Sequence, residues 1–371
     1  MNAPNPPFMP GIELNGRFYW EIVRPLLERR LPALPHAAAL IGYGSDVLGF
    51  DTPMSTDHNW GPRLQLFLPE ADFDRQAAAV DELLRNNLPA AFLGYSVHYT
   101  LPDPNDNGTQ HRAEHSGGPV NHLLEITTVE RYFRRYLGVS PDAPLSDLDW
   151  LALPEQKLLE VTAGAVYFDG LGRLEAARAR FAYFPRPVWL CRLAAAWARI
   201  GEEEPFMGRT GDLGDELGSR LIAARLARDL IGLAFLYSRR YKPYSKWLGT
   251  AFGRLPIAAT LQPLLLGLVT GADWRSREAP FVQALRLLAE EHNRQGITPP
   301  LATDIRLFFG RPFQVLMAGR FADAIAAELD DPRLRLAATT VGAVDQFSDC
   351  VAVHSDARRA AALSAIYALD A

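Results

Sequence analysis

Residues Leu40–Leu68 read LIGYGSDVLGFDTPMSTDHNWGPRLQLFL, and this stretch decides the fold expected for the chain. It connects two apolar runs, at residues 36–41 and 63–68, through glycines, a serine and an Asp-x-Asn sequence. A short apolar run closed by glycines is typical of a buried strand that enters a tight turn. The second run also predicts a strand, which Pro62 interrupts because proline cannot donate to a central ladder.

The composition is that of an ordinary globular chain. With 371 residues, 48% of them hydrophobic and 22% charged, the chain is long enough for two domains, or three. Its net charge of -5 argues against a general nucleic-acid binder, which usually carries a basic excess. A local basic pocket for a phosphorylated small molecule is still compatible with this charge.

Several features indicate a cytoplasmic protein without a membrane partner. Cys191 and Cys350 are too few for a disulfide framework, and neither has metal-ligand spacing. The first residues lack the basic start and apolar core of a signal peptide. The most apolar stretch, residues 255–269, is shorter than a membrane span and predicts a core helix with a break at Pro263.

The periodicity of apolar residues predicts an α+β fold. A mixed sheet with flanking helices is expected in residues 1–140, with helices at 18–31 and 72–88 and further strands at 92–101 and 121–129. From Thr128 onward helical spacing takes over, and residues 187–204, 212–241 and 280–296 predict the strongest helices. We therefore expect a small α/β domain at 1–140 and an all-helical domain at 141–371.

The polar residues of the opening stretch suggest a phosphate and metal site. Gly44 permits a sharp turn that exposes consecutive N–H groups, and these with the Ser45 hydroxyl could cradle phosphate oxygens. Asp57 follows Ser45 by twelve residues, and Asn59 lies two further on, on the same side of an extended segment. Glu125, an acid among apolar and β-branched residues, is the candidate third ligand of a shared divalent ion.

These motifs resemble those of a known superfamily. GYGS, an eleven-residue gap and DHN look like the glycine-serine and paired-carboxylate motif of the DNA polymerase beta-like nucleotidyltransferases. Within it the chain is similar to an uncharacterised bacterial family, over the motifs GFDTPMSTDHNWGPRLQLFL, KPYSKWL, RPFQVLMAGRF and GAVDQFSD. The resemblance extends from about Leu40 to Asp349, and it implies a nucleotidyltransferase-like domain followed by a helical one.

The resemblance implies a Mg²⁺-dependent transfer of a nucleoside monophosphate, with AMP from ATP as the expected donor, to a hydroxyl of a small-molecule acceptor. Asp57 and Glu125 would be the catalytic carboxylates. Asp57, Asn59 and Glu125 would hold the metal, and Gly44 and Ser45 would contact the outer phosphates.

Three further residues are expected to contact the nucleotide. Arg63, which follows Pro62, is expected to direct its guanidinium at phosphate. By analogy with the helical domains of related transferases, Tyr244 and Lys246 are candidates for triphosphate contacts, with Lys242 behind them. The alternative is a purely structural role, in which Tyr244 and Lys246, beside Trp247, only cover the edge of a core.

Asn59 departs from the superfamily pattern, which has a second carboxylate at this place. An amide oxygen can bind a hard cation but removes one negative charge. Two other functions therefore stay open: a non-catalytic nucleotide-binding or regulatory protein with a degenerate metal site, and nucleotidyl modification of a protein or an RNA. The acidic balance makes nucleic acid the less favoured partner. Gly42–Ser45 could also be an ordinary turn, and Glu125 could face solvent.

Overall fold

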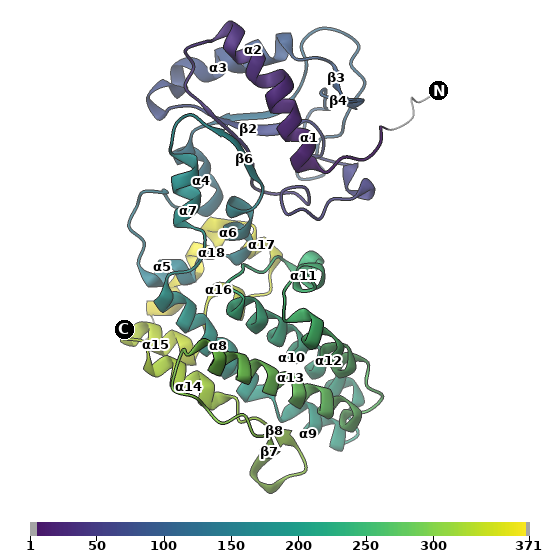
Figure 1. The fold of residues 1–371 in the computed structure, drawn as a ribbon, viewed down its shortest axis with the longest axis vertical. Helices are drawn as coiled ribbons and strands as arrows, with labels where there is room; N and C mark the ends of the chain where they lie inside the picture. The colour runs from purple at the N-terminus through teal and green to yellow at the C-terminus, as the bar shows by residue number, and fades with distance from the viewer. Residues whose placement is uncertain (1–5, 369–371) are drawn as a thin grey trace. The chain divides into compact units, whose positions relative to one another are not determined.

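The computed structural model describes residues 6–368, and the chain divides into two compact units (Figure 1). The first unit contains residues up to Ala143 together with Lys157–Ala182, and the second contains Pro144–Gln156 and the residues from Tyr183 onward. The first unit holds a small mixed sheet, and the second is mainly helical. The α+β class predicted from the sequence is confirmed.

A four-stranded sheet forms the centre of the first unit, in the order β5-β2-β1-β6. Its strands are β1 (Ala37–Leu40), β2 (Arg63–Phe67), β5 (Leu123–Thr127) and β6 (Ala165–Asp169). β1 pairs antiparallel with β2 and with β6, whereas β2 pairs parallel with β5. The end of β1 therefore lies at the same edge of the sheet as the beginnings of β2 and β5.

Helices cover both faces of this sheet. The helical elements of the first unit are α1 (Gly11–Phe18), the π-helical turn η1 (Tyr19–Val23), α2 (Arg24–Arg30), the 3-10 turn η2 (Pro53–Thr56), α3 (Glu70–Asn87), α4 (Val129–Leu137) and α7 (Leu174–Arg180). Residues of α1, α2 and α3 pack with Leu64 and Leu66 of β2 in one hydrophobic core. On the opposite face, Phe67 of β2 contacts Tyr132 of α4. Alternation along β2 thus sends successive side chains to the two faces.

The predicted strands differ in how far they extend. The runs at 36–41, 63–68 and 121–129 form β1, β2 and β5, and β2 begins directly after Pro62. The run at 92–101 gives only a hairpin of β3 (Ala91–Phe92) and β4 (Tyr95–Ser96) in a separate two-stranded sheet. Leu93 and Gly94 both have positive φ, as a two-residue hairpin loop requires.

The second unit is a helical assembly with one small hairpin. Its elements are α5 (Asp147–Leu151), α8 (Arg186–Glu203), α9 (Phe206–Asp212), α10 (Glu216–Tyr237), α11 (Ser245–Phe252), α12 (Ala258–Thr270), α13 (Trp274–Gln295), β7 (Arg306–Leu307), the 3-10 turn η3 (Phe308–Gly310), β8 (Gln314–Val315), α14 (Gly319–Ala327), α15 (Pro332–Thr339), α16 (Val344–Phe347), α17 (Val351–His354), α18 (Ala357–Ala362) and the 3-10 turn η4 (Leu363–Ala368). Helix α6 (Glu155–Thr162) crosses from this unit to the first.

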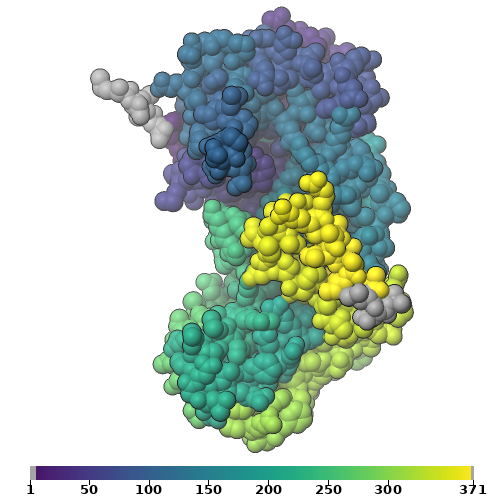
Figure 2. Space-filling view, turned by 180° about the vertical axis from the view of Figure 1, so that it is seen from behind, coloured from purple at the N-terminus to yellow at the C-terminus, as the bar shows by residue number. Residues whose placement is uncertain are grey.

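The long helices α8, α10 and α13 correspond to the strongest helices expected from the sequence. α8 packs against α14 and α15, and α10 against α8, α9 and α13. The apolar stretch at 255–269 forms α12, which continues through Pro263 where a break was expected. Its proline lies in the second turn, and the helix packs against α10 and α13. The residues of α16 to α18, drawn in yellow, lie at the surface of this unit (Figure 2).

The chain passes between the two units more often than a single boundary would allow. The sequence places one boundary near residue 140, and the chain does leave the first unit after Ala143. It then returns for residues 157–182, which supply β6 and α7. Nowhere in residues 6–368 is a helix both long enough and apolar enough to span a membrane.

Candidate functional site

The glycine turn after β1 is the place where phosphate binding is expected. Gly42 and Gly44 have φ values of 96° and 132°, which L-residues rarely adopt. Among residues 6–368, no acceptor is found for the backbone N–H groups of Tyr43, Gly44 and Ser45. Ser45 is half-buried, and its carbonyl accepts from the N–H of Phe50. Consecutive N–H groups without a protein acceptor can bind an anion.

A buried ion pair fixes this turn to the sheet. Arg63, the first residue of β2, donates through Nε and Nη2 to Asp46 at 3.1 and 2.8 Å, and through Nη2 to the carbonyl of Tyr43 at 2.9 Å. Both side chains are almost fully buried. Burial acts to lower the pKa of Arg63, but the adjacent Asp46 carboxylate outweighs it and raises the pKa, so the guanidinium stays charged.

The tight packing at Gly44 explains its residue type. A Cβ on Gly44 would lie 2.2 Å from Oδ1 of Asp46 and 2.5 Å from Nη2 of Arg63. The partners of Arg63 in the structure are therefore protein groups that shape the turn. Whether it also contacts phosphate stays a prediction.

Asp57 and Asn59 lie in the segment that leads into β2, at the same edge of the sheet as the turn. The side chain of Asp57 is 66% exposed, and Oδ2 lies 3.0 Å from Nδ1 of His58. Burial acts to raise the pKa of the Asp57 carboxyl, but hydrogen bonds from His58 and the backbone outweigh it and lower the pKa. The carboxylate is accessible and ionised at neutral pH.

Asn59 has a structural role that the sequence did not reveal. Its φ is 46°, a left-handed conformation that asparagine tolerates. Its N–H donates to the carbonyl of Gln110 at 2.9 Å, and its Oδ1 accepts from the N–H of Gln110 at 3.0 Å. The neighbouring His111 contacts the carbonyl of Asp57 at 2.9 Å. Residues 110–111 of the polar loop thus hold the Asp57–Asn59 segment in place.

Glu125 lies in β5, opposite Gln65 of β2 and two register positions in from Arg63. Its side chain is partly exposed and forms an ion pair with Arg135 of α4. Tyr132 of the same helix is nearby: burial, and secondarily the charge of Glu125, raise the pKa of its hydroxyl well above the usual value. Glu125 therefore lies on the sheet face that α4 covers.

The candidate ligands belong to segments at one end of the sheet. The turn at Gly44–Ser45 follows β1 there, the segment with Asp57 and Asn59 leads into β2, and Glu125 belongs to a strand that begins there. Within residues 6–368, no three His, Cys, Asp or Glu side chains are grouped so that they could hold a metal ion. The predicted set of Asp57, Asn59 and Glu125 contains two side chains of these types.

Tyr244 and Lys246 belong to the second unit. Tyr244 is the N-cap residue of α11, and its N–H donates to Oε1 of Gln156 at 2.8 Å. Nζ of Lys246 lies 5.1 Å from the ring centroid of Trp247. Lys242 donates its N–H to Oε2 of Glu155 at 3.0 Å. The contacts of Tyr244 and Lys246 with a triphosphate stay predictions.

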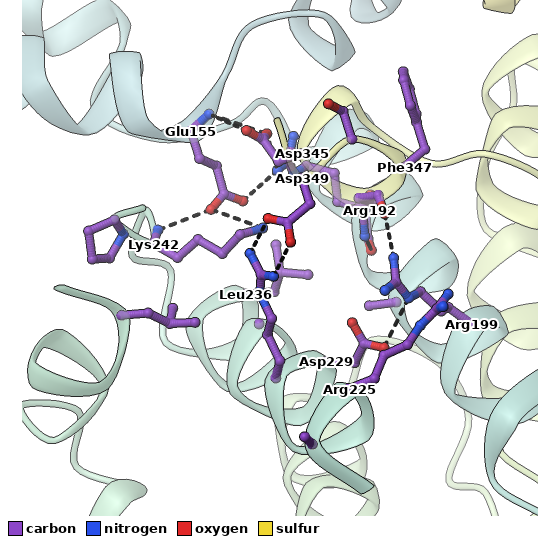
Figure 3. Close-up of a pocket in the computed structure, with 18 residues that line it drawn as sticks. Glu155, Arg192, Arg199, Arg225, Asp229, Leu236, Lys242, Asp345, Phe347 and Asp349 are labelled. Atoms are coloured by element: carbon purple, nitrogen blue, oxygen red, sulfur yellow. Dashed lines mark hydrogen bonds and ion pairs between the residues drawn. The ribbon is translucent and has the colours of Figure 1, made fainter. Parts of the chain in front are cut away.

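The second unit contains a charged pocket of about 560 Å³ (Figure 3). Its lining comes from α8, α10, the segment before α11 and residues 345–349. At one side Nη2 of Arg192 contacts Glu155 and, at 2.9 Å, Oδ2 of Asp345. Asp345 also accepts from the N–H of Glu155 at 3.1 Å. Burial acts to raise the pKa of Asp345, but the charge of Arg192 outweighs it and lowers the pKa.

The residues that hold the glycine turn and the charged pocket together were not predicted from the sequence. Asp46 follows Ser45 directly, and an acid beside a glycine-serine turn was the available signal for a buried partner of Arg63. Arg192 and Arg199 recur at i and i+7 within residues 187–200, which are otherwise apolar, and this is a signal for buried or ligand-facing cations. Asp345 offers no local signal, because its partners are more than 150 residues away.

Part of the chain matches a known family model. Residues 150–248 match the model of a domain of unknown function, DUF4037. The matched range includes Arg192, Lys242 and the KPYSKWL motif, and it excludes Ser45, Asp57 and Glu125. No curated protein matches the chain.

Proposed function

We propose that the chain is a magnesium-dependent nucleotidyltransferase that transfers a nucleoside monophosphate to a hydroxyl of a small molecule, with ATP as the expected donor. The observation that carries this proposal is the turn at Tyr43–Ser45. Its N–H groups have no acceptor among residues 6–368, and Asp57 lies on the segment at the same edge of the sheet. This edge offers N–H groups for phosphate beside an accessible carboxylate.

The proposed reaction transfers one nucleotidyl group. The acceptor oxygen attacks the α-phosphorus of the triphosphate and forms the new P–O bond. The bond between the α-phosphorus and the oxygen that bridges to the β-phosphate breaks, and its electron pair leaves with pyrophosphate. The proton of the acceptor hydroxyl passes to a carboxylate, for which Glu125 is the candidate, and from there to water.

The donor set fits a hard cation in its chemistry. Asp57 and Glu125 supply carboxylate oxygens and Asn59 an amide oxygen, which are the ligands that Mg²⁺ accepts. A bound Mg²⁺ would neutralise the triphosphate and align it. Each donor also has a protein partner, since Asp57 contacts His58, Asn59 contacts Gln110, and Glu125 contacts Arg135. The two carboxylates must exchange these partners for the cation.

Because all three predicted metal ligands already have protein partners, one alternative is favoured: a nucleotide-binding protein without transferase activity. Asn59 is held at both its N–H and its side-chain oxygen by Gln110, so its residue type is explained without a metal. In this alternative the turn still binds phosphate, and the carboxylates stay with His58 and Arg135. The two hypotheses differ in whether pyrophosphate is released.

The test combines product release with a charge change. The full chain is incubated with ATP, Mg²⁺ and a pool of small hydroxylated metabolites, and pyrophosphate is measured. Asn59→Asp adds a carboxylate while keeping an acceptor for the Gln110 N–H and a residue that tolerates positive φ. Asn107→Asp is the matched control, because Asn107 also has positive φ, at 49°, and is exposed.

A transferase predicts pyrophosphate release that rises in Asn59→Asp and not in Asn107→Asp, because the new carboxylate strengthens Mg²⁺ binding. The non-catalytic alternative predicts no release. It also predicts that Asn59→Asp loses stability at saturating Mg²⁺ without any gain in ATP affinity. The added carboxylate would lie near Asp57, and without a bound cation the two negative charges would repel each other. That second pattern would contradict the metal site.

A further inference from the structure

The pocket of the second unit is lined by cationic side chains and by carboxylates that pair with them. Five cationic side chains line it: Arg192, Arg199, Arg225, Arg228 and Lys242. Four carboxylates of the lining accompany them, and Glu203, outside the lining, pairs with Arg225 at 2.8 Å. Guanidinium groups present flat arrays of N–H donors that match phosphate oxygens, and four arginines line this one pocket. Three of them, Arg192, Arg199 and Arg225, are labelled in Figure 3.

Arg192 has donors that the protein leaves without acceptors. Its side chain is fully buried, and Nη2 makes both of its ion pairs, to Glu155 and Asp345. Nε and Nη1 have no hydrogen-bond partner among residues 6–368. A buried donor of a charged group that lacks an acceptor is costly and is rare in folded proteins. A ligand with several acceptor oxygens in this pocket would satisfy these donors.

At the other side of the pocket, Arg228 is already paired with a carboxylate. Nη1 and Nη2 of Arg228 both contact Asp349, one oxygen each, and the two side chains are 45% and 69% exposed. Asp349 lies in the short segment between α16 and α17. The pair shows that an acceptor with two oxygens fits against Arg228. Because the pair is exposed, it stabilises the fold weakly and is open to exchange.

We propose that this pocket binds a small molecule that carries a phosphate group, which displaces Asp349 from Arg228 and supplies acceptors to Arg192. The site goes beyond the proposed transferase function, because it lies within the second unit and uses none of the residues at the glycine turn. A phosphate dianion carries more charge than the single Asp349 carboxylate. It therefore competes well for the guanidinium of Arg228.

Titration calorimetry with pyrophosphate, without Mg²⁺, tests this site in the full chain. Arg228→Gln removes the guanidinium, and we expect roughly tenfold weaker binding, since a charge-assisted pair contributes about 1.5 kcal/mol or more. Arg220→Gln is the matched control: Arg220 lies on the same helix α10, pairs with Glu216 and is outside the lining. The Arg220→Gln variant should bind pyrophosphate with the affinity of the parent.

Asp349→Asn should change the affinity for pyrophosphate in the opposite direction. A folding defect would weaken binding, so it could not produce this result. Removal of the competing carboxylate should strengthen pyrophosphate binding by about two- to fivefold. This factor corresponds to the free energy of an exposed ion pair, which is at most ~1 kcal/mol. Citrate, a carboxylate polyanion, should bind more weakly than pyrophosphate. Equal binding of citrate would overturn the assignment to phosphate.

The glycine turn provides the control that separates this site from the proposed function. Ser45→Ala should leave the pyrophosphate affinity of the pocket unchanged. The proposal is wrong if pyrophosphate does not bind, if Arg228→Gln and Arg220→Gln behave alike, or if Ser45→Ala abolishes binding while Arg228→Gln does not. The last of these results would overturn the pocket and still support phosphate binding at the turn.

Discussion

At the scale of single residues, the Arg63–Asp46 pair does more to define the proposed phosphate site than the residues that the motif contains. Arg63 connects the start of β2 to the carbonyl of Tyr43 and to Asp46, on either side of the two residues expected to contact phosphate. With its charge balanced by Arg63, Asp46 repels a bound phosphate less. The turn can therefore be anion-binding although an acid lies within it.

Loss of this cation should destabilise the fold strongly. Arg63→Met leaves the Asp46 carboxylate buried and without its ion pair, and removal of one partner of a buried pair costs about 3 to 5 kcal/mol. Arg131→Met is the control, since Arg131 pairs with Glu70 and is 43% exposed, and it should cost at most ~1 kcal/mol. Urea denaturation measures both, and equal losses would contradict the structural role of Arg63.

His292 should make the stability of the second unit depend on pH. Its ring is fully buried, Nε2 contacts Oγ1 of Thr298 at 2.8 Å, and burial lowers its pKa to about 4. Because the unfolded state binds the proton more readily, the contribution of His292 to stability is complete above pH ~6.5 and is lost as the pH falls toward 4. The loss by pH ~4.5 is about 2 to 3 kcal/mol.

His292→Gln removes this titration and keeps a group that can contact Thr298. Urea denaturation of parent and variant at pH ~7.5 and ~4.5 should show that the parent loses about 2 to 3 kcal/mol more than the variant. An identical pH dependence of the two proteins would show that His292 titrates normally in the folded state.

At the scale of elements, the turn after β1 requires glycine for two reasons that a substitution can separate. Gly44→Ala adds a Cβ at a φ of 132° and also meets Asp46 and Arg63 at less than van der Waals distance. Gly117→Ala has similar strain, at a φ of 113°, but no atom within 4 Å of the added Cβ. The strain common to both is about 1 to 2 kcal/mol.

We expect Gly44→Ala to lose more thermal stability than Gly117→Ala and to weaken nucleotide binding as well, because the clash displaces the pair that holds the turn. Gly117→Ala should leave nucleotide binding unchanged. Thermal unfolding together with ATP titration would measure both effects. Equal unfolding temperatures for the two variants would mean that the turn is not packed as described.

Elements were predictable where their signal is local. The apolar runs of β1, β2 and β5 and the amphipathic pattern of α3 suffice to place them. β6 was missed because its five residues, AVYFD, lie among helices and pair with β1 some 130 residues earlier. The ten-residue strand predicted at 92–101 was too long, because positive φ at Leu93 is unusual for leucine and was not expected there.

The residues of the candidate site could be predicted from the motif, but the residues that hydrogen-bond or ion-pair with them could not. Ser45 and Asp57 lie at the same sheet edge, as their position between two antiparallel strands implies. The partners of Asn59 and Glu125 come from Gln110 and Arg135, residues of a loop and of a helix whose contacts depend on tertiary packing. A pattern of residue types contains no information on such partners.

At the scale of the whole molecule, two kinds of chemistry belong to two separate compact units. In the first unit the N–H groups of Tyr43, Gly44 and Ser45 have no acceptor among residues 6–368, and in the second guanidinium groups line a pocket. The match to DUF4037 covers residues 150–248, which include α8 and α10 of the second unit together with β6 of the first. The matched residues therefore contribute to both units.

The central claim is that the first unit binds a metal-bound nucleotide with Asp57 as a ligand. Calorimetric titration of ATP, with and without Mg²⁺, into the parent, Asp57→Ala and the control Asp106→Ala tests it most directly. Asp57 and Asp106 are both exposed, so neither substitution should unfold the chain. We predict that Mg²⁺ strengthens ATP binding to the parent and to Asp106→Ala, whereas Asp57→Ala loses this dependence and binds Mg-ATP roughly tenfold more weakly, a difference of about 1.4 kcal/mol. Binding of Mg-ATP to Asp57→Ala with the affinity of the parent would contradict the claim.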